Sequence, residues 1–155
     1  MKINVIVKNL LNVIKFLILI CYICMKVTFF ILILQPMNIS ILYIDDEPIN
    51  IQLFEINFKK FYTVYSAISG KEALEIIQNT PIDFLISDYR MPEMDGMELI
   101  EEVKKIKPDI KCYLLSAYPE TEIRNYLGNN NLLDGFIAKP WKKEEILQII
   151  QEKAL

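Results

Sequence analysis

The segment FLISDYRMPEMDG (84–96) decides the fold, because an apolar run of strand length ends in it at a carboxylate, Asp88. Three other short runs of aliphatic and aromatic residues also end in polar side chains. Runs of this length, bounded by turn residues, indicate buried strands of a parallel sheet. The runs are ILYI (41–44) before Asp45 and Asp46, FLIS (84–87) before Asp88, YLL (113–115) before Ser116, and FIA (136–138) before Lys139 and Pro140.

The segments between these runs have helical periodicity, which predicts right-handed crossovers and a parallel five-stranded sheet. The expected strands begin at Ile39 and cover 62–67, 82–87, 110–115 and 135–138, and the expected helices cover 48–58, 70–79, 95–106, 119–128 and 142–153. The residues expected to face the sheet include Leu53, Phe54 and Asn57 on the first helix, Leu99, Ile100, Val103 and Ile106 on the third, and Ile146, Leu147 and Ile150 on the last.

The polar residues at the strand ends predict a common site, because ligands bind such sheets outside the carboxyl ends of the strands. Three carboxylates brought together repel one another unless a hard cation lies among them, and Mg²⁺ prefers oxygen ligands. A hydroxyl and an ammonium group beside them suit the oxygens of a transferring phosphoryl group. The chain has no histidine, which excludes a histidine base and a zinc site that uses one. These residues therefore predict a carboxylate that accepts a phosphoryl group.

Each residue taken singly also has an ordinary structural interpretation. An Asp at a strand end is often a helix N-cap or a turn former, and Ser116 could cap the next helix. Lys139 could be a solvated surface lysine. For these structural interpretations to be correct, they must hold independently at all four strand ends. A single phosphoryl-acceptor site explains all four residues together and is therefore favoured.

The segment from residue 38 to about 153 resembles the receiver domain of bacterial two-component response regulators. The resemblance rests on IDDEP (44–48), SDYRMPEMDG (87–96), LLSA (114–117) and AKPW (138–141), in the family's order and spacing. It implies a flavodoxin-like (βα)5 fold, doubly wound, with strand order 2-1-3-4-5. It also implies that Asp88 is the phosphoacceptor. For Mg²⁺, it makes Asp46 a direct ligand, Asp45 a ligand through water, and Arg90 a ligand through its backbone carbonyl. Ser116 would bind a phosphoryl oxygen, Lys139 would pair with Asp88 or its phosphate, and Pro140 would follow a cis peptide bond.

The resemblance further implies a switch and two contact surfaces. Phe136 holds the position of an aromatic side chain that turns inward when the Ser116 hydroxyl moves to the phosphate. The surface that responds, and that binds a downstream target or forms a homodimer, would comprise Tyr126, Leu132, Leu133 and Phe136. The phosphodonor would contact Ile49 and Ile56. Arg90 and Tyr118 would set the lifetime of the phosphoryl group.

The implied function is a phosphorylation-dependent signalling switch, supplied by a sensor histidine kinase or a histidine phosphotransfer protein, with no output domain expected in this chain. The chain would be a phosphoacceptor rather than an enzyme with a separate substrate. One alternative is a receiver-like interaction module that never takes phosphate. A phosphohydrolase of the haloacid-dehalogenase type is disfavoured, because it needs an Asp where this chain has Arg90.

Charge and composition narrow the class of partner. The segment 37–155 contains all 20 acidic residues, whereas four of the 17 basic residues precede it, so its formal charge is −7 against −3 for the whole chain. An acidic domain of this kind is not expected to bind nucleic acid directly. The three cysteines indicate no disulfide framework, and Cys112 is expected in the core.

The first 36 residues form a separate apolar segment, and the expected receiver domain covers 37–155. Phe16 to Leu34 is just long enough for a membrane helix, although Lys26 lies within it. The lysines before this span would keep the N-terminus in the cytoplasm and place the receiver outside, away from ATP-dependent kinases. We therefore favour a translation start at Met37 and a cytoplasmic receiver, with a membrane helix or another interaction helix as the alternatives.

Overall fold

The computed structural model describes residues 39–119, 121, 123 and 132–153. The chain divides into two compact units, Met1–Met37 and Asn38–Leu155, and all helices and strands among the described residues belong to the second unit. Each of these helices is too short or too polar to cross a lipid bilayer. The predicted apolar segment 1–36, Tyr126 and most of the predicted helix 119–128 lie outside the described residues.

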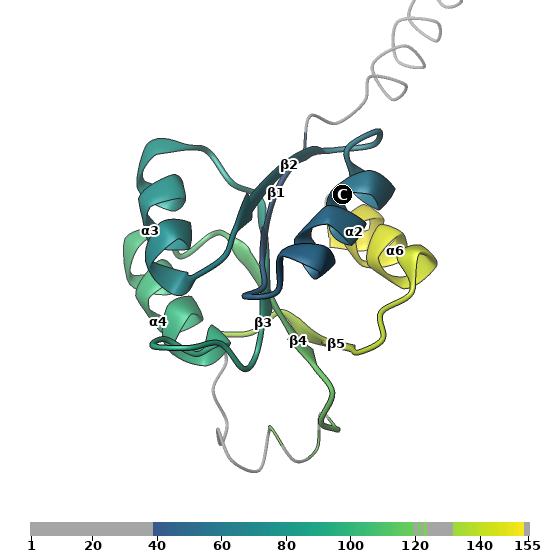
Figure 1. Cartoon of the computed structure of the whole chain (residues 1–155). Coiled ribbons are helices and arrows are strands. Elements are labelled where there is room, and N and C mark those ends of the chain that lie inside the picture. The colour runs from purple at the N-terminus through teal and green to yellow at the C-terminus, as the bar shows by residue number, and fades with distance from the viewer. Residues whose placement is uncertain (1–38, 120, 122, 124–131, 154–155) are drawn as a thin grey trace, which may run out of the picture. The chain divides into compact units, whose positions relative to one another are not determined.

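Five parallel strands form one sheet in the order β2-β1-β3-β4-β5, which confirms the predicted doubly wound, flavodoxin-like arrangement (Figure 1). The short apolar runs form these strands because both faces of the sheet are covered. The strands are β1 (Ser40–Ile44), β2 (Thr63–Ala67), β3 (Phe84–Asp88), β4 (Lys111–Ser116) and β5 (Gly135–Ala138).

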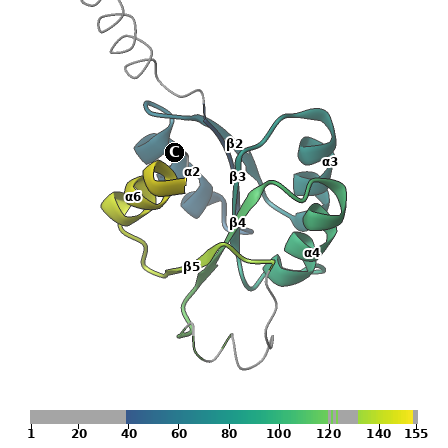
Figure 2. The ribbon, with the colours of Figure 1, turned by 180° about the vertical axis from the view of Figure 1, so that it is seen from behind.

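Helices cover the sheet on both sides, as the views from the front and from behind show (Figures 1 and 2). On one side lie α2 (Pro48–Phe58) and α6 (Lys143–Lys153), and on the other lie α3 (Gly70–Asn79) and α4 (Gly96–Ile106). The sheet therefore separates two core clusters, one packed under α3 and α4 and the other under α2 and α6.

The helix starts follow from local hydrogen bonding. Asp95 accepts from the backbone N–H groups of Met97 and Glu98, while the Glu98 carboxylate accepts from the Asp95 N–H, so the two side chains form a capping box. Asp95 thus precedes α4 as its cap, and the helix begins one residue later than predicted. Ser69 caps α3 by accepting from the backbone of Glu72.

Two predictions of buried side chains are wrong. Leu53 is 50% exposed, because α2 packs on the sheet through Ile51, Phe54 and Phe58 instead. Ile106 is 45% exposed at the last position of α4, where the helix has passed the edge of the core.

Candidate phosphoryl-acceptor site

The strand register brings the polar strand ends to one edge of the sheet. Ile44 pairs with Ser87, so Asp45 follows β1 beside Asp88 at the end of β3. In the same way Ser116 pairs with Ala138, which sets Ser116 beside Lys139. The fold thus gathers residues that are up to 94 positions apart in the sequence.

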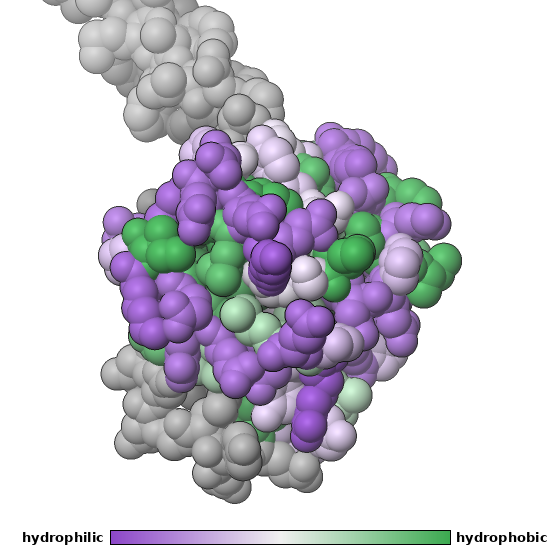
Figure 3. All heavy atoms as spheres, turned by 60° about the vertical axis from the view of Figure 1, so that its left-hand side comes forward, coloured by the Kyte–Doolittle hydropathy of each residue, from purple (hydrophilic) through white to green (hydrophobic). Residues whose placement is uncertain are grey.

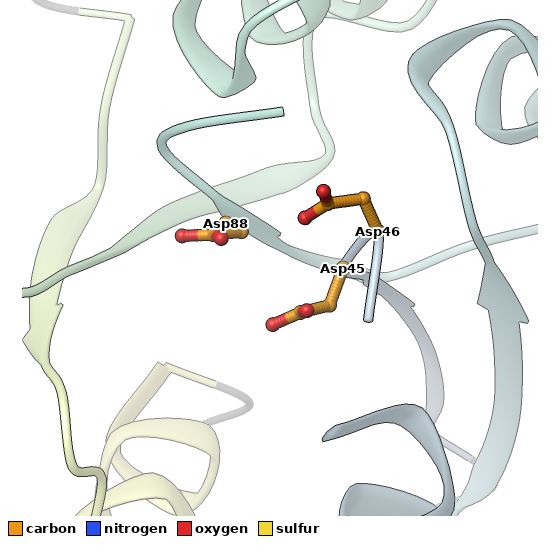
Figure 4. A group of neighbouring side chains, drawn as sticks. All are labelled: Asp45, Asp46 and Asp88. Carbon is orange, nitrogen blue, oxygen red and sulfur yellow. The ribbon is translucent and has the colours of Figure 1, made fainter. Parts of the chain in front are cut away.

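Three carboxylates lie together at this edge. Asp45, Asp46 and Asp88 each offer an oxygen, and these oxygens all lie within 4.8 Å of one another. Figure 4 shows the three side chains extending in the same direction from two neighbouring strand ends. Such a group of oxygen ligands fits a hard divalent cation, because a cation relieves the mutual repulsion of the carboxylates.

Asp45 is fully buried, and four donors hold its carboxylate. Its Oδ1 accepts from the backbone N–H of Glu47 at 3.0 Å and from the Asn50 amide at 2.9 Å. Its Oδ2 accepts from the hydroxyl of Tyr43 at 3.1 Å and from the ammonium group of Lys139 at 3.2 Å. Since a carboxylate has about four acceptor positions, these donors leave Asp45 little capacity for a direct bond to a cation.

Asp46 has the opposite surroundings. It is exposed, and no donor among the described residues is hydrogen-bonded to it. Asp88 is only partly exposed, with 13% of its side chain accessible. Of the three carboxylates, Asp46 is therefore the one with its oxygens most available to a cation.

Lys139 joins two of the carboxylates. Its Nζ lies 2.8 Å from Oδ2 of Asp88 and 3.2 Å from Oδ2 of Asp45, and the peptide bond from Lys139 to Pro140 is cis. Burial raises the pKa of Asp88, and the charge of Asp45 adds to this, against the opposing effect of Lys139. Burial by itself would lower the pKa of Lys139, but its contacts with Asp88 and Asp45 raise it overall. Burial is thus the main cause of the raised pKa of Asp88, whereas the two carboxylates are the cause of the raised pKa of Lys139.

The loops beside Asp88 hold the remaining predicted residues. Ser116 is buried, and its hydroxyl oxygen accepts from the backbone N–H of Tyr118 at 2.9 Å. The guanidinium carbon of Arg90 lies 5.4 Å from the ring centre of Tyr89 and 5.6 Å from that of Tyr118, so it links the loops after β3 and β4.

The residues of the predicted responding surface lie further along the sheet. Leu132, Leu133 and Phe136 are half-buried and pack against the core cluster under α3 and α4. Tyr126, the fourth member, lies outside the described residues.

Three residues of the site were missed from the sequence. Tyr43 could have been found, because side chains two apart in a strand share a face, and this places Tyr43 on the side of Asp45. Asn50 gave no such signal, since its position depends on how α2 turns back over the end of β1. Gly96 is required because a Cβ there would lie 2.1 Å from the backbone oxygen of Asp88.

Comparison with known proteins identifies the family. The chain matches the response regulator receiver domain over residues 41–151. It is 32% identical to Sporulation initiation phosphotransferase F of Bacillus subtilis over 117 residues, which cover 75% of this chain and 94% of the relative. It is also 39% identical to Sensor kinase CckA of Brucella abortus over 93 residues, or 59% of this chain, but it spans only 10% of that protein. It likewise spans 25% of the Transcriptional regulatory protein GlrR of Escherichia coli, at 32% identity over 72% of this chain.

Solved structures give the same result. A CheY-like response regulator receiver domain protein from Methanospirillum hungatei has a TM-score of 0.68 at 28% identity, covering 74% of this chain and 92% of that one. A response regulator receiver domain protein from Clostridium thermocellum has a TM-score of 0.66 at 27% identity, again covering 74% and 92%. The acidic strand ends and Lys139, placed as described, agree with this result. The match over residues 41–151 shows that this chain belongs to the family of response regulator receiver domains.

Proposed function

We propose that the chain is a signalling switch that accepts a phosphoryl group on Asp88 from the phosphohistidine of a sensor kinase or phosphotransfer protein. The observation that carries this proposal is the position of Lys139, whose ammonium group contacts Asp88 at 2.8 Å beside two further carboxylates. The chain is then a phosphoacceptor that promotes its own phosphorylation and dephosphorylation, and a cytoplasmic location fits a donor that depends on ATP.

The chain's own residues account for the transfer. Lys139 holds Oδ2 of Asp88, which leaves Oδ1 to attack phosphorus in line. The new P–O bond forms as the P–N bond of phosphohistidine breaks, and the departing imidazole keeps that electron pair. Lys139 and the Ser116 hydroxyl then hold phosphoryl oxygens, after Ser116 has given up its bond from Tyr118. Positioning and charge thus suffice without a protein base.

The carboxylates fit Mg²⁺, with Asp46 and Asp88 as direct ligands and the backbone carbonyl of Arg90 as a third. When bound, the cation would neutralise the carboxylates and the oxygens of the phosphoryl group. Asp45, already held by four donors, is assigned a role through water. This division follows the difference in surroundings between the buried Asp45 and the exposed Asp46.

Labelling with a small phosphodonor tests the proposal. Acetyl phosphate with Mg²⁺ should add one phosphoryl group to the wild-type chain, detected by mass spectrometry. Asp88→Asn should abolish the labelling, and omission of Mg²⁺ should do the same. Asp109→Asn is the matched control, because Asp109 is exposed and lies away from the site, so it should be labelled normally. A wild-type chain that neither takes phosphate nor binds beryllofluoride would instead be a receiver-like interaction module.

An apolar stripe on α2 is the surface we assign to the phosphodonor. Ile49, Leu53 and Ile56 are 67%, 50% and 79% exposed and recur at helical spacing on one side of α2. The stripe begins four residues after Asp45, so a partner docked on it lies close to the acidic edge. On the side of the molecule where α3 and α4 lie, hydrophobic residues are interspersed with hydrophilic ones (Figure 3).

Charging this stripe separates docking from chemistry. Ile49→Glu with Ile56→Glu should slow transfer from a kinase that phosphorylates the wild type, while labelling by acetyl phosphate stays unchanged. Ile106→Glu is the control, since Ile106 is an exposed isoleucine on α4. Equal loss of both kinds of labelling would contradict a docking role.

Phosphorylation would be transmitted through Ser116 and Phe136. Movement of the Ser116 hydroxyl to the phosphate leaves room for the ring of Phe136 to turn inward. The surface of Tyr126, Leu132, Leu133 and Phe136 would then bind a downstream protein or a second copy of the chain. Direct binding of nucleic acid is not proposed, given the charge of −7 over residues 37–155.

A further inference from the structure

Tyr43 is a buried polar residue that the proposed phosphotransfer leaves without a role. It lies in β1 with no exposed surface, and its ring stacks on Phe54 with centres 4.1 Å apart and planes 12° apart. Its hydroxyl lies 3.1 Å from Oδ2 of Asp45. The stacking fixes the ring, so the direction of the hydroxyl is fixed as well.

The direction of this hydrogen bond is set by its neighbours. A carboxylate can only accept, so Tyr43 donates to Asp45. A tyrosine hydroxyl is protonated at neutral pH, so the group can donate this hydrogen bond.

Tyr43 and Lys139 share one oxygen of Asp45. Lys139 lies 3.2 Å from this Oδ2 and 2.8 Å from Oδ2 of Asp88. Without the tyrosine hydroxyl, Lys139 would be the only donor among the described residues left on Oδ2 of a fully buried carboxylate. An under-satisfied buried oxygen attracts its remaining donor more strongly, so the lysine would move toward Asp45 and away from Asp88.

We propose that Tyr43 is a positioning residue, whose hydrogen bond to Asp45 keeps the ammonium group of Lys139 available to Asp88 and to the phosphoryl group. The inference rests on the proposed phosphorylation of Asp88. The inference also gives Asp45 a second role besides its charge. Its Oδ2 holds the ammonium group of Lys139, and the hydrogen bond from Tyr43 to the same oxygen limits how strongly it does so.

Tyr43→Phe removes the hydroxyl and keeps the stacked ring. Its Mg²⁺ affinity, followed by amide chemical shifts in NMR titrations, should stay within about twofold of wild type. Its affinity for beryllofluoride at saturating Mg²⁺ should fall by about three- to tenfold, the effect of one weakened hydrogen bond, and labelling by acetyl phosphate should slow to match. Tyr113→Phe is the matched control, since the Tyr113 hydroxyl belongs to the same core cluster and has no hydrogen-bond partner among the described residues.

Asn50→Ala provides a second comparison, because Asn50 donates to Oδ1 of Asp45, the oxygen that Lys139 does not touch. It should weaken beryllofluoride binding less than Tyr43→Phe does. The inference is overturned if Tyr43→Phe binds beryllofluoride like wild type, if it fails to fold, or if Tyr113→Phe or Asn50→Ala loses as much affinity. A wild-type chain that neither takes phosphate nor binds beryllofluoride would remove the proposed function, and this inference with it.

Discussion

Gly96 is the position at which a single methyl group should disturb both stability and phosphorylation. It is the first residue of α4, and a Cβ there would lie 2.1 Å from the backbone oxygen of Asp88 and 2.7 Å from Cδ2 of Leu114. Since ordinary van der Waals contact begins at about 3.4 Å, the start of α4 must then move by about 1.3 Å. The shift also strains the hydrogen bond from the Gly96 N–H to the Tyr89 carbonyl.

The expected magnitude follows from two opposing effects. Overpacking of this kind destabilises a protein by about 1–3 kcal/mol, and the better helix propensity of Ala returns about 0.5–1 kcal/mol. Gly96→Ala should therefore lower the free energy of unfolding in urea by about 1–2 kcal/mol. Because Asp88 moves with its carbonyl, labelling by acetyl phosphate should slow by about tenfold to a hundredfold.

Gly70→Ala is the matched control. Gly70 is the first residue of α3, and the atom nearest to its added Cβ is the sulfur of Met94 at 2.7 Å. A flexible methionine can move aside, so this variant should stay close to wild type in stability and labelling. If Gly96→Ala is as stable and as readily labelled as Gly70→Ala, the tight contact between α4 and Asp88 is not needed for stability or phosphorylation.

Three other predictions concern side-chain substitutions. Asp134→Asn should lower stability by about 1 kcal/mol at neutral pH. Burial alone would raise the pKa of Asp134, but the N–H of Cys112 and two lysines lower it overall, so its stabilisation is present above about pH 4 and is lost as the pH falls through the lowered pKa. Urea unfolding at pH 7 and pH 3 should show the difference from wild type shrinking at low pH. Arg90→Ala with Tyr118→Ala should shorten the lifetime of the phosphoryl group, because in the proposed site both side chains would obstruct the attacking water; an unchanged decay rate would refute this. Phe136→Ala should leave labelling intact but uncouple it from partner binding or dimerisation, and a variant that still responds fully would show that Phe136 only packs.

The sheet and its acidic edge could be predicted because their causes are local. A short apolar run that ends in a polar residue specifies a buried parallel strand and places that residue at the carboxyl edge. Asp45, Asp88 and Lys139 meet for this reason alone, and the alternation of helices and strands sets the topology.

Contacts that depend on how a helix is rotated could not be predicted in this way. Helix α2 carries apolar residues on every side, so its periodicity does not show that Phe54 faces the sheet while Leu53 faces solvent. The same rotation decides that Asn50 reaches Asp45. The bond from Tyr43 to Asp45 was accessible from strand alternation, but a buried tyrosine is ordinarily explained by packing alone.

The division of the core by the sheet has a kinetic consequence. The stripe of Ile49, Leu53 and Ile56 lies on α2, which packs over one cluster, whereas Phe136 packs against the cluster on the other side. If a donor docks on α2 and a target docks near Phe136, as proposed, the two partners would bind on opposite sides of the sheet and would not compete for the same surface. The target would then not need to dissociate before Asp88 is phosphorylated again, so one bound target could pass through repeated cycles of phosphorylation.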